Sequence, residues 1–354
     1  MTQAMSLAAR PKELIENPGH PEADVLSDVL RTIRLSGAVQ FCFMPTGTWQ
    51  TDDKPSLAKA AGSSSGVIPF HMVIEGTCWM KMDGQHTVLA EGDIVAFPFG
   101  TGHQLGVGSG GRLITPMGDL PPKPWRNIPM LRYGIEPSRV RLLCGYLHCD
   151  AINFAPFRES LPKLLHIRTQ GSDNGALLQA IIRQVASEAD MPRTGGLSML
   201  ERLTEVSFIE VLRQHISAAR SGSFGWLAAA GDPCLGRCLA LIHENPRRDW
   251  SVQSLAAGCG LSRSRLAERF EAVLGTSPMR YLRDWRLCLA SIELATTSKA
   301  IAVIAHDAGY GTEAAFNRAF SRAYGTPPAT WRQGARSGSA NGANAAAASA
   351  SLSV

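Results

Sequence analysis

The chain has 354 residues and a formal net charge of +5, with 45% hydrophobic and 18% charged side chains. This length suffices for two domains of ordinary size, and this composition is typical of a globular protein with sizeable cores, which excludes a disordered or fibrous chain. The net charge is too small to identify a nucleic-acid-binding protein by itself.

Targeting signals are not evident. The opening residues contain no apolar h-region, so we expect no secretion signal, and no run of about 18 apolar residues predicts a membrane span. The eight cysteines are scattered without a CxxC pair, which argues against a disulfide framework. We therefore expect a cytoplasmic protein with reduced cysteines and no contact with a membrane.

The first half of the chain changes from a helical to a β-rich texture. After an N-terminal extension (1–23), the apolar spacing in 24–34 predicts an amphipathic helix. From about 37 to 150, short β-rich runs alternate with Gly, Pro and Asp, a pattern typical of a β-barrel or sandwich. The runs that we expect to form strands are 38–44, 70–82, 86–98 and 141–149, whereas 109–137 reads as an irregular excursion.

Helical periodicity returns at 176–189 and 197–219, within a region (151–233) that connects the β-rich part to the C-terminal part. These helices either supply a dimer face or pack on the barrel of their own chain. We interpret 221–233 as a linker. The low-complexity residues 334–354 predict a disordered tail.

An internal repeat dominates the C-terminal part. Residues 256–278 and 305–328 share a glycine, a small capping residue, a phenylalanine and a closing Gly-Thr, at an offset of 49 residues before the turn and 50 after it. This is the layout of two helix-turn-helix motifs, whose second helices can enter a DNA major groove. Residues 234–333 also contain 13 Lys and Arg against 8 Asp and Glu, so the positive charge that attracts phosphate lies in this segment.

Local signals define the elements of this module. A helix over 234–246 should end before a proline, and 278–298 should form one long helix joining the two motifs. We expect Ser251 and Ser262 to cap the helices that follow them, and Gly260 to make the sharp turn. The spacing of Leu266, Phe270 and Val273 predicts the buried face of the second helix. In the second copy, Phe316 and Phe320 should be buried.

The segments SVQSLAAGCGLSRSRLAERF, YLRDWRLCLA and IAVIAHDAGYGTEAAFNRAFSRAYGTPPATWR resemble the AraC/XylS family of bacterial transcription regulators. The resemblance implies a DNA-binding domain over 234–333, with both second helices reading adjacent major-groove segments about one helical turn apart. Carried over by position, the DNA-binding residues would be Arg263, Ser264, Arg265, Glu268, Glu313, Ala314, Asn317 and Arg318. Arginine can hydrogen-bond to guanine and asparagine to adenine, while glutamate can accept a hydrogen bond from cytosine.

A second resemblance lies in the β-rich part. Residues from Gly92 to His103 read G-x5-P-x-G-x2-H, which is similar to the second motif of cupin barrels. His71 and Glu75 reproduce H-x3-E of the first motif, but Pro69 stands where metal-binding cupins have another histidine. The resemblance implies a cupin-like sensory barrel over about 24–150, and the missing ligand weakens the inference of a metal enzyme.

Five residues are candidates for an effector or metal pocket in this barrel: His71, Glu75, His103, Cys144 and His148. By period 2, His71 shares a strand face with Glu75, and Cys144 shares one with His148. Imidazoles with a thiolate would suit Zn²⁺. The alternative is that these are core or pocket residues with ordinary hydrogen bonds, serving as polar groups of a pocket for an organic effector.

Together these patterns predict an α+β chain of two domains, a cupin-like barrel followed by an all-α domain with two helix-turn-helix motifs. We expect a non-enzymatic transcription regulator without catalytic residues, whose partners are double-stranded DNA, a small-molecule effector, RNA polymerase and a second copy of the chain. The alternative is a cupin-type metal enzyme with an appended helical domain.

Overall fold

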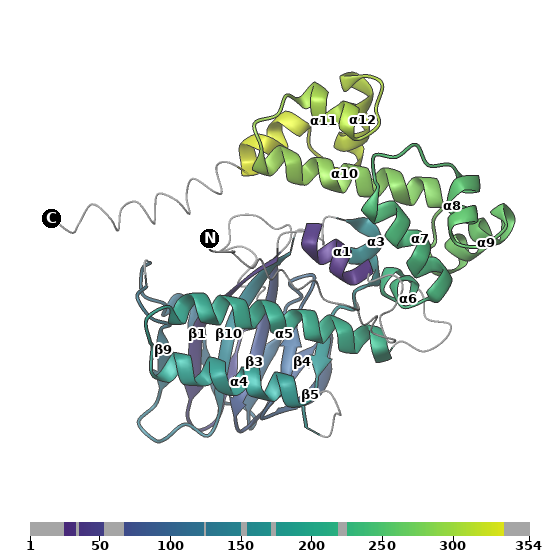
Figure 1. Cartoon of the computed structure of the whole chain (residues 1–354). Helices are drawn as coiled ribbons and strands as arrows, with labels where there is room; N and C mark the ends of the chain where they lie inside the picture. The colour runs from purple at the N-terminus through teal and green to yellow at the C-terminus, as the bar shows by residue number, and fades with distance from the viewer. Residues whose placement is uncertain are drawn as a thin grey trace, which may run out of the picture.

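The computed structural model describes residues 25–32, 35–52, 67–123, 125–149, 154–170, 175–218 and 225–335. The expected N-terminal extension and nearly all of the expected tail lie outside these residues. The described chain has a sheet-rich N-terminal part followed by a helical C-terminal part (Figure 1), so the predicted fold class is confirmed.

The strands form two sheets that face each other, rather than one closed barrel. Sheet A has the spatial order β11 (Leu165–Ile167), β6 (Ile94–Ala96), β3 (Val67–Glu75), β10 (Arg141–Cys149), β1 (Leu35–Pro45) and β9 (Met130–Tyr133). Sheet B has the order β5 (Gln85–Ala90), β4 (Thr77–Met82), β7 (Gln104–Val107), β2 (Trp49–Thr51) and β8 (Arg112–Ile114). The expected irregular excursion contributes β8, β9 and a 3-10 turn, Pro116–Gly118.

Side chains on alternate positions of sheet A enter two different cores. In β1, Phe41 and Phe43 point between the sheets, whereas Cys42 and Met44 point to the opposite face. Eight consecutive residues of β3 are buried, because this central strand is covered on both faces. The near-continuous apolar run at the start of 70–82 is therefore explained by burial of both faces of β3, whereas the rest of that range forms β4 and alternates between buried and more exposed residues.

Two long helices cover the outer face of sheet A (Figure 1). These are α4 (Gly175–Asp190) and α5 (Gly196–Ala218), close to the ranges predicted from periodicity. Helix α5 approaches β1 so closely that a Cβ at Gly37 would lie 2.7 Å from Cγ2 of Thr204. Both helices pack on the sheet of their own chain, as the second interpretation expected, and their use as a dimer face stays a prediction.

Three short helices lie between the sheets and the C-terminal part. They are α1 (Val25–Thr32), α3 (Ala155–Ser160) and α6 (Trp226–Ala230). The interpretation of 221–233 as a linker is wrong for its described part, because Trp226 is fully buried and starts a helix. Glycines on both sides of this segment are typical of a linker, but here they flank a short apolar helix that packs on its neighbours.

The C-terminal part is helical, with α7 (Pro233–Glu244), α8 (Val252–Gly258), α9 (Arg263–Leu274), α10 (Pro278–Thr296), α11 (Ile301–Asp307) and α12 (Glu313–Tyr324), followed by a last helical segment at 328–335. The first four contribute to the same apolar cluster as the outer face of sheet A, whereas α11 and α12 form a separate cluster with α10. Among the described residues, no helix is both long and apolar enough for a membrane crossing.

Candidate DNA-binding surface and effector pocket

The internal repeat corresponds to two helix-turn-helix units of the same size. Helices α8 and α11 each have seven residues, and α9 and α12 each have twelve. Both turns close in the same way, because the amide of Leu261 donates to the carbonyl of Ala256 at 2.9 Å and that of Tyr310 donates to Ala305 at 3.0 Å. The glycine before each donor has a positive φ, 68° at Gly260 and 83° for its counterpart. These are Schellman turns, and the sharp turn predicted at Gly260 is confirmed.

Side-chain caps fix where the second helices begin. The hydroxyl of Ser262 accepts a hydrogen bond from the amide of Arg265, and that of Thr312 accepts from Ala315. Ser251 forms a capping box at the start of α8. Thus both predicted serine caps are confirmed. Each second helix ends at a glycine in the left-handed conformation, and a helix starting with Pro278 follows the first copy.

The buried faces of α9 and α12 are those predicted from the spacing. Leu266 and Phe270 are fully buried in α9, Val273 is half-buried, and Phe316 and Phe320 are fully buried in α12. Consequently the expected outward residues lie on the opposite face. Exposed there are Arg263, Ser264, Arg265, Glu268, Glu313, Ala314 and Arg318, whereas Asn317 is half-buried.

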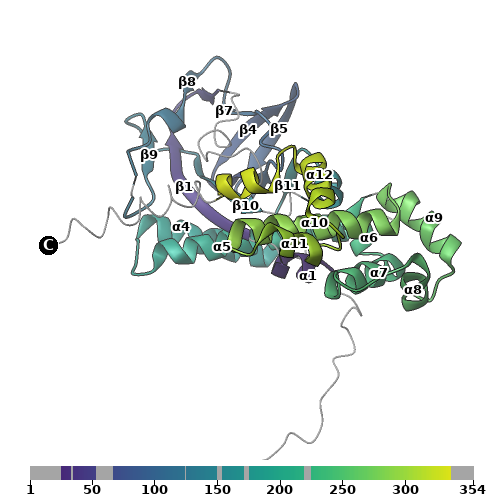
Figure 2. The same cartoon turned by 90° about the horizontal axis from the view of Figure 1, so that it is seen from above.

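Helix α10 sets the spacing of the two units. At 1.5 Å per residue, its 19 residues span about 28 Å. Because α9 precedes its start and α11 follows its end, the two units lie toward different ends of α10 (Figure 2). The length of α10 is comparable with the roughly 34 Å of one DNA turn.

Several arginines near the surface have structural partners. Arg269 forms an ion pair with Asp232, which itself caps α7. Arg283 donates two hydrogen bonds to the carboxylate of the adjacent Asp284. Arg286 donates to two backbone carbonyls, one of them that of Pro246 at 2.6 Å. The structure therefore gives these arginines intramolecular roles.

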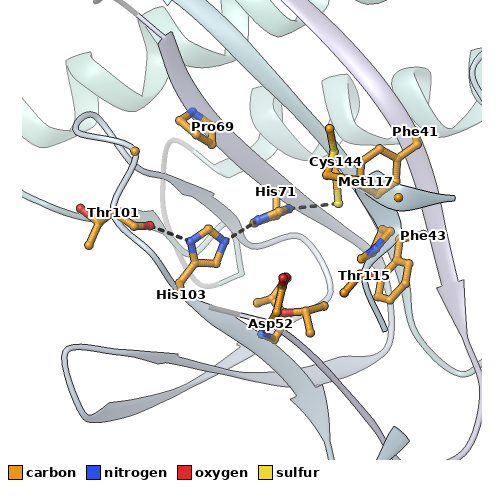
Figure 3. A pocket seen from close by; sticks show the side chains of 15 residues that line it. Phe41, Phe43, Asp52, Pro69, His71, Thr101, His103, Thr115, Met117 and Cys144 are labelled. Atoms are coloured by element: carbon orange, nitrogen blue, oxygen red, sulfur yellow. Dashed lines mark hydrogen bonds between the residues drawn. The ribbon is translucent and has the colours of Figure 1, made fainter. Parts of the chain in front are cut away.

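A cavity of about 320 Å³ lies between the two sheets (Figure 3). Its polar lining includes His71, His103 and Cys144, which the sequence analysis selected. The remaining lining residues are Phe41, Phe43, Thr51, Asp52, Pro69, Gly100, Thr101, Leu105, Thr115, Pro116, Met117 and Gly118. A concave, largely apolar space with a few polar groups is the usual form of a small-molecule site.

The three polar side chains form a directed chain of hydrogen bonds (Figure 3). His103 Nδ1 contacts the carbonyl of Thr101 at 3.0 Å, so this nitrogen carries the proton. His103 Nε2 then accepts from His71 Nε2 at 2.8 Å, and His71 Nδ1 accepts from the thiol of Cys144 at 3.0 Å. This assignment of the tautomers follows from the Thr101 carbonyl at the end of the hydrogen-bond chain, because a carbonyl can only accept.

Burial keeps every member of this chain uncharged. It lowers the pKa of His71 well below the ordinary value, an effect increased by the neighbouring His103, whose own pKa is also lowered by burial. Burial raises the pKa of Cys144 well above the usual thiol value. The cross-strand register explains the contact, because Cys144 and His71 are directly paired between β10 and β3.

These residues do not converge on one point as zinc ligands would. Cys144 lies at Nδ1 of His71 and His103 lies at Nε2, on opposite edges of one imidazole ring. Glu75 and His148 do not line the cavity, since each lies four residues, about 13 Å, along its strand from the nearest member of the chain. Among the described residues, no group of three His, Cys, Asp or Glu is arranged to hold a metal ion. The donor set therefore does not fit Zn²⁺.

The lining has one acidic side chain among the described residues. This is Asp52, and the described lining contains no Lys or Arg. Burial favours the neutral form of both lining histidines. Asp52 and the two phenylalanines of β1 were not predicted from the sequence, because their strands approach the cavity only in the folded sheets.

An aromatic cluster joins the segment that follows β10 to helices α6, α7 and α10. Phe154, just before α3, contacts the rings of Tyr281 and Trp285 edge to face at 5.3 and 5.1 Å. The hydroxyl of Tyr281 also accepts from Trp226 Nε1 at 2.7 Å and contacts His243 Nε2 at 2.8 Å. All five residues are buried. We call them the aromatic joint. No local sequence pattern predicted it, because its members are spread over more than 130 residues.

Comparison with known proteins agrees with both halves of this description. A cupin family model matches residues 24–217, and a helix-turn-helix model matches 255–334. The regulator AlkR of Acinetobacter baylyi is 31% identical over 313 residues, which cover 88% of this chain and 99% of the relative. An AraC-like transcription regulator of Streptomyces antibioticus is 28% identical over 88% of this chain and 98% of the relative. RclR of Escherichia coli, an HTH-type transcriptional activator, is 25% identical over the same shares. The chain belongs to the AraC family of DNA-binding transcription regulators and carries an N-terminal cupin domain.

Proposed function

We propose that this regulator reads two successive DNA segments through α9 and α12, and that a small molecule in the cavity of the cupin domain controls this binding. The observation that carries the proposal is the division of the apolar cores. The first helix-turn-helix shares its core with the cupin domain, whereas the second has a core of its own. A change in the cupin domain would therefore act first on the position of α9.

The DNA-reading residues follow from exposure and chemistry. Arg265 and Arg318 present exposed guanidinium groups that can bind guanine through two hydrogen bonds. Glu268 and Glu313 would accept from cytosine, and Ala314 would contact a thymine methyl group. Arg263 at the start of α9 is placed to meet phosphate. The buried Oδ1 of Asn317 has no hydrogen-bond partner among the described residues, so no such bond holds its amide inward. With the amide turned outward, Asn317 would read adenine.

The cavity favours an uncharged or cationic effector with an apolar body. Phe41, Phe43 and Met117 offer apolar contact, and Asp52 offers a carboxylate. An anionic ligand would meet that carboxylate, and the described lining offers no basic side chain to balance it. Both ring nitrogens of His103 are engaged within the described chain of hydrogen bonds, so the hydroxyls of Thr101 and Thr115 are the nearer polar groups for a ligand.

Coupling between cavity and DNA would run through sheet A and the aromatic joint. The strand that carries Cys144 ends at Cys149, a few residues before Phe154. Phe154 in turn packs on the long helix α10. A ligand that favours one arrangement of this joint would shift the population of DNA-binding conformations.

Further features complete the proposal. The cupin domain would comprise 24–150, the connecting helices 151–233 and the DNA-binding domain 234–333, with the protein acting in the cytoplasm without catalytic activity. A homodimer would match paired DNA half-sites, and contact with RNA polymerase would convert binding into regulation. The rival function, a cupin-type metal enzyme, is disfavoured by the donor set described above.

The test measures DNA affinity of the full chain with a panel of uncharged, cationic and anionic small molecules. We expect uncharged or cationic compounds to change the affinity, and Met117→Trp, which fills the cavity, to abolish that response while leaving affinity without ligand unchanged. Met130→Trp, on the exposed strand β9, is the matched control. A response that survives Met117→Trp would refute the cavity as the effector site.

A further inference from the structure

The two helix-turn-helix units have separate apolar cores, so their relative orientation depends on what else joins them. The first packs in the cluster that contains Phe270, and the second in the cluster that contains Phe320. Helix α10 contributes side chains to both clusters. Because apolar contacts are non-directional, polar contacts of defined geometry across the boundary fix how the two units are turned toward each other.

The loop between α7 and α8, residues 245–250, belongs to the first unit. Trp250 is buried in the cluster of that unit, and its Nε1 donates to the carbonyl of Asn245 at 2.9 Å. The amide of Trp250 donates to the carbonyl of Arg248, whose guanidinium lies 4.2 Å from the centre of the Trp250 ring. These contacts hold the loop to itself and to the core, so it moves with the first unit.

An ion-pair network connects this loop to the second unit. Arg247 of the loop contacts Glu293 of α10 at 2.9 Å and Asp307, the last residue of α11, at 3.0 Å. Lys299, which lies between α10 and α11, contacts the same two carboxylates at 3.0 and 4.0 Å. The acidic side chains are only 24% and 22% exposed, so water and salt screen this network less than an isolated surface pair.

Arg286 of α10 makes a second connection across the same boundary. Its guanidinium donates to the carbonyls of Pro246 at 2.6 Å and Arg248 at 2.8 Å, both in the loop of the first unit. The other side of this guanidinium lies against Gly309, where an added Cβ would be 2.6 Å from Nη1. Gly309 makes the turn that precedes α12. One side chain therefore separates the loop of the first unit from the turn of the second.

We propose that these contacts form a brace that holds the recognition helices α9 and α12 at one relative orientation and thereby sets which spacing of DNA blocks the protein accepts. The brace consists of Arg247, Arg286, Glu293, Lys299 and Asp307. They are positioning residues, which act through the two helices and not by facing a base. The proposal rests on tandem reading of DNA by α9 and α12.

The geometry of DNA makes this role measurable. One base pair inserted between the two blocks rotates one block by about 34° and moves it by about 3.4 Å relative to the other. A protein with an intact brace cannot follow this movement and loses base contacts in one block. A protein without the brace can follow it more easily, so its affinity for the longer site falls less.

Contact with phosphate is the alternative role for an exposed arginine such as Arg247, and it would strengthen binding to every DNA alike. The partner residue separates the two roles. Arg247→Gln removes a positive charge and Asp307→Asn removes a negative one, so their effects on overall affinity through phosphate have opposite signs. Both substitutions break the same ion pair, so through the brace both reduce the preference for one spacing.

The experiment measures the affinity of the full chain for its selected two-block site and for the same site with one inserted base pair. The ratio of these affinities, the spacing penalty, is insensitive to net charge. We expect a penalty of about thirtyfold for the wild type, the loss of one or two base contacts. Arg247→Gln and Asp307→Asn should each reduce it about threefold, as for one partly exposed ion pair. Arg286→Gln loses two hydrogen bonds and should reduce it further.

Two further variants are controls, and urea unfolding checks that every variant is folded. Arg247→Lys keeps a positive charge beside both carboxylates, so it should keep the spacing penalty of the wild type. Arg248→Ala removes a positive charge from the same loop but leaves the backbone carbonyl that accepts from Arg286. It should weaken binding to both sites alike and leave the spacing penalty unchanged.

The outcomes separate the brace from tandem reading itself. Spacing penalties that stay at the wild-type value in Arg247→Gln, Asp307→Asn and Arg286→Gln would overturn the brace alone. The same conclusion would follow if Arg248→Ala reduced the penalty as much as Arg247→Gln, or if the wild type selected two blocks and bound both sites equally. A wild type that selects a single block would refute tandem reading, and the brace with it.

Discussion

Acid should weaken the aromatic joint through His243. This side chain is buried against the ring of Trp285, and burial lowers its pKa to about 3 from an ordinary value of 6.5. In the unfolded chain it binds a proton as the pH falls through 6.5, whereas the folded chain resists protonation down to about 3. The free energy of unfolding therefore decreases as the pH falls through this window. At pH 4.5 the loss from this residue is about 2.7 kcal/mol, from about 1.36 kcal/mol per pH unit.

His243→Phe isolates this effect. Phenylalanine keeps a ring against Trp285 but loses the hydrogen bond to Tyr281, at a cost of about 1 kcal/mol. At pH 7 the variant should be less stable than wild type by this amount. At pH 4.5 it should be more stable by about 1.7 kcal/mol, because it has nothing to protonate. Urea unfolding of the full chain, followed by tryptophan fluorescence, measures both differences. An equal stability difference between variant and wild type at both pH values would refute the assignment of this acid sensitivity to His243. His71 and His103 are present in both proteins, so their contributions to the pH dependence cancel in this comparison.

Four further substitutions test other features of the structure. Phe154→Ala should lower the free energy of unfolding by about 3–5 kcal/mol, since it empties the middle of the aromatic joint, and urea unfolding would measure it. Gly309→Ala should destabilise more than Gly260→Ala. Both have positive φ, at a cost of about 1–2 kcal/mol. A Cβ at Gly309 would also lie 2.6 Å from the Arg286 guanidinium. Around a Cβ at Gly260, the described residues other than the two adjacent ones leave open space within 4 Å. Arg318→Ala should relax preference at one base pair and cost about 1–3 kcal/mol in competition assays, and unchanged preference would show that this side chain does not face a base.

The helix-turn-helix units were predictable because their signals are local. Ser262 as a cap, Gly260 as a left-handed turn and Phe270 as a buried residue each depend on a few neighbours in sequence. The repeat doubled this information, since two copies with the same spacing constrain each other. The predicted caps and buried faces consequently agree with the structure.

Features that depend on contacts between distant parts of the chain were harder to predict from the sequence. The aromatic joint brings together Phe154 and Trp285, which no local pattern connects. Period 2 placed Glu75 on the same strand face as His71, but the distance along the strand separates them, and Glu75 meets Arg141 instead. Strand periodicity specifies a face and not a position along it, so the cavity could be predicted only in part.

The central claim is tandem reading of DNA by α9 and α12. Its most direct test is selection of bound DNA from a random pool by the full-length protein under reducing conditions, followed by sequencing. The account predicts two enriched blocks about one helical turn apart, with the block lost in Arg265→Ala differing from that lost in Arg318→Ala. A single enriched block that both substitutions affect, or no enriched sequence at low salt, would contradict it.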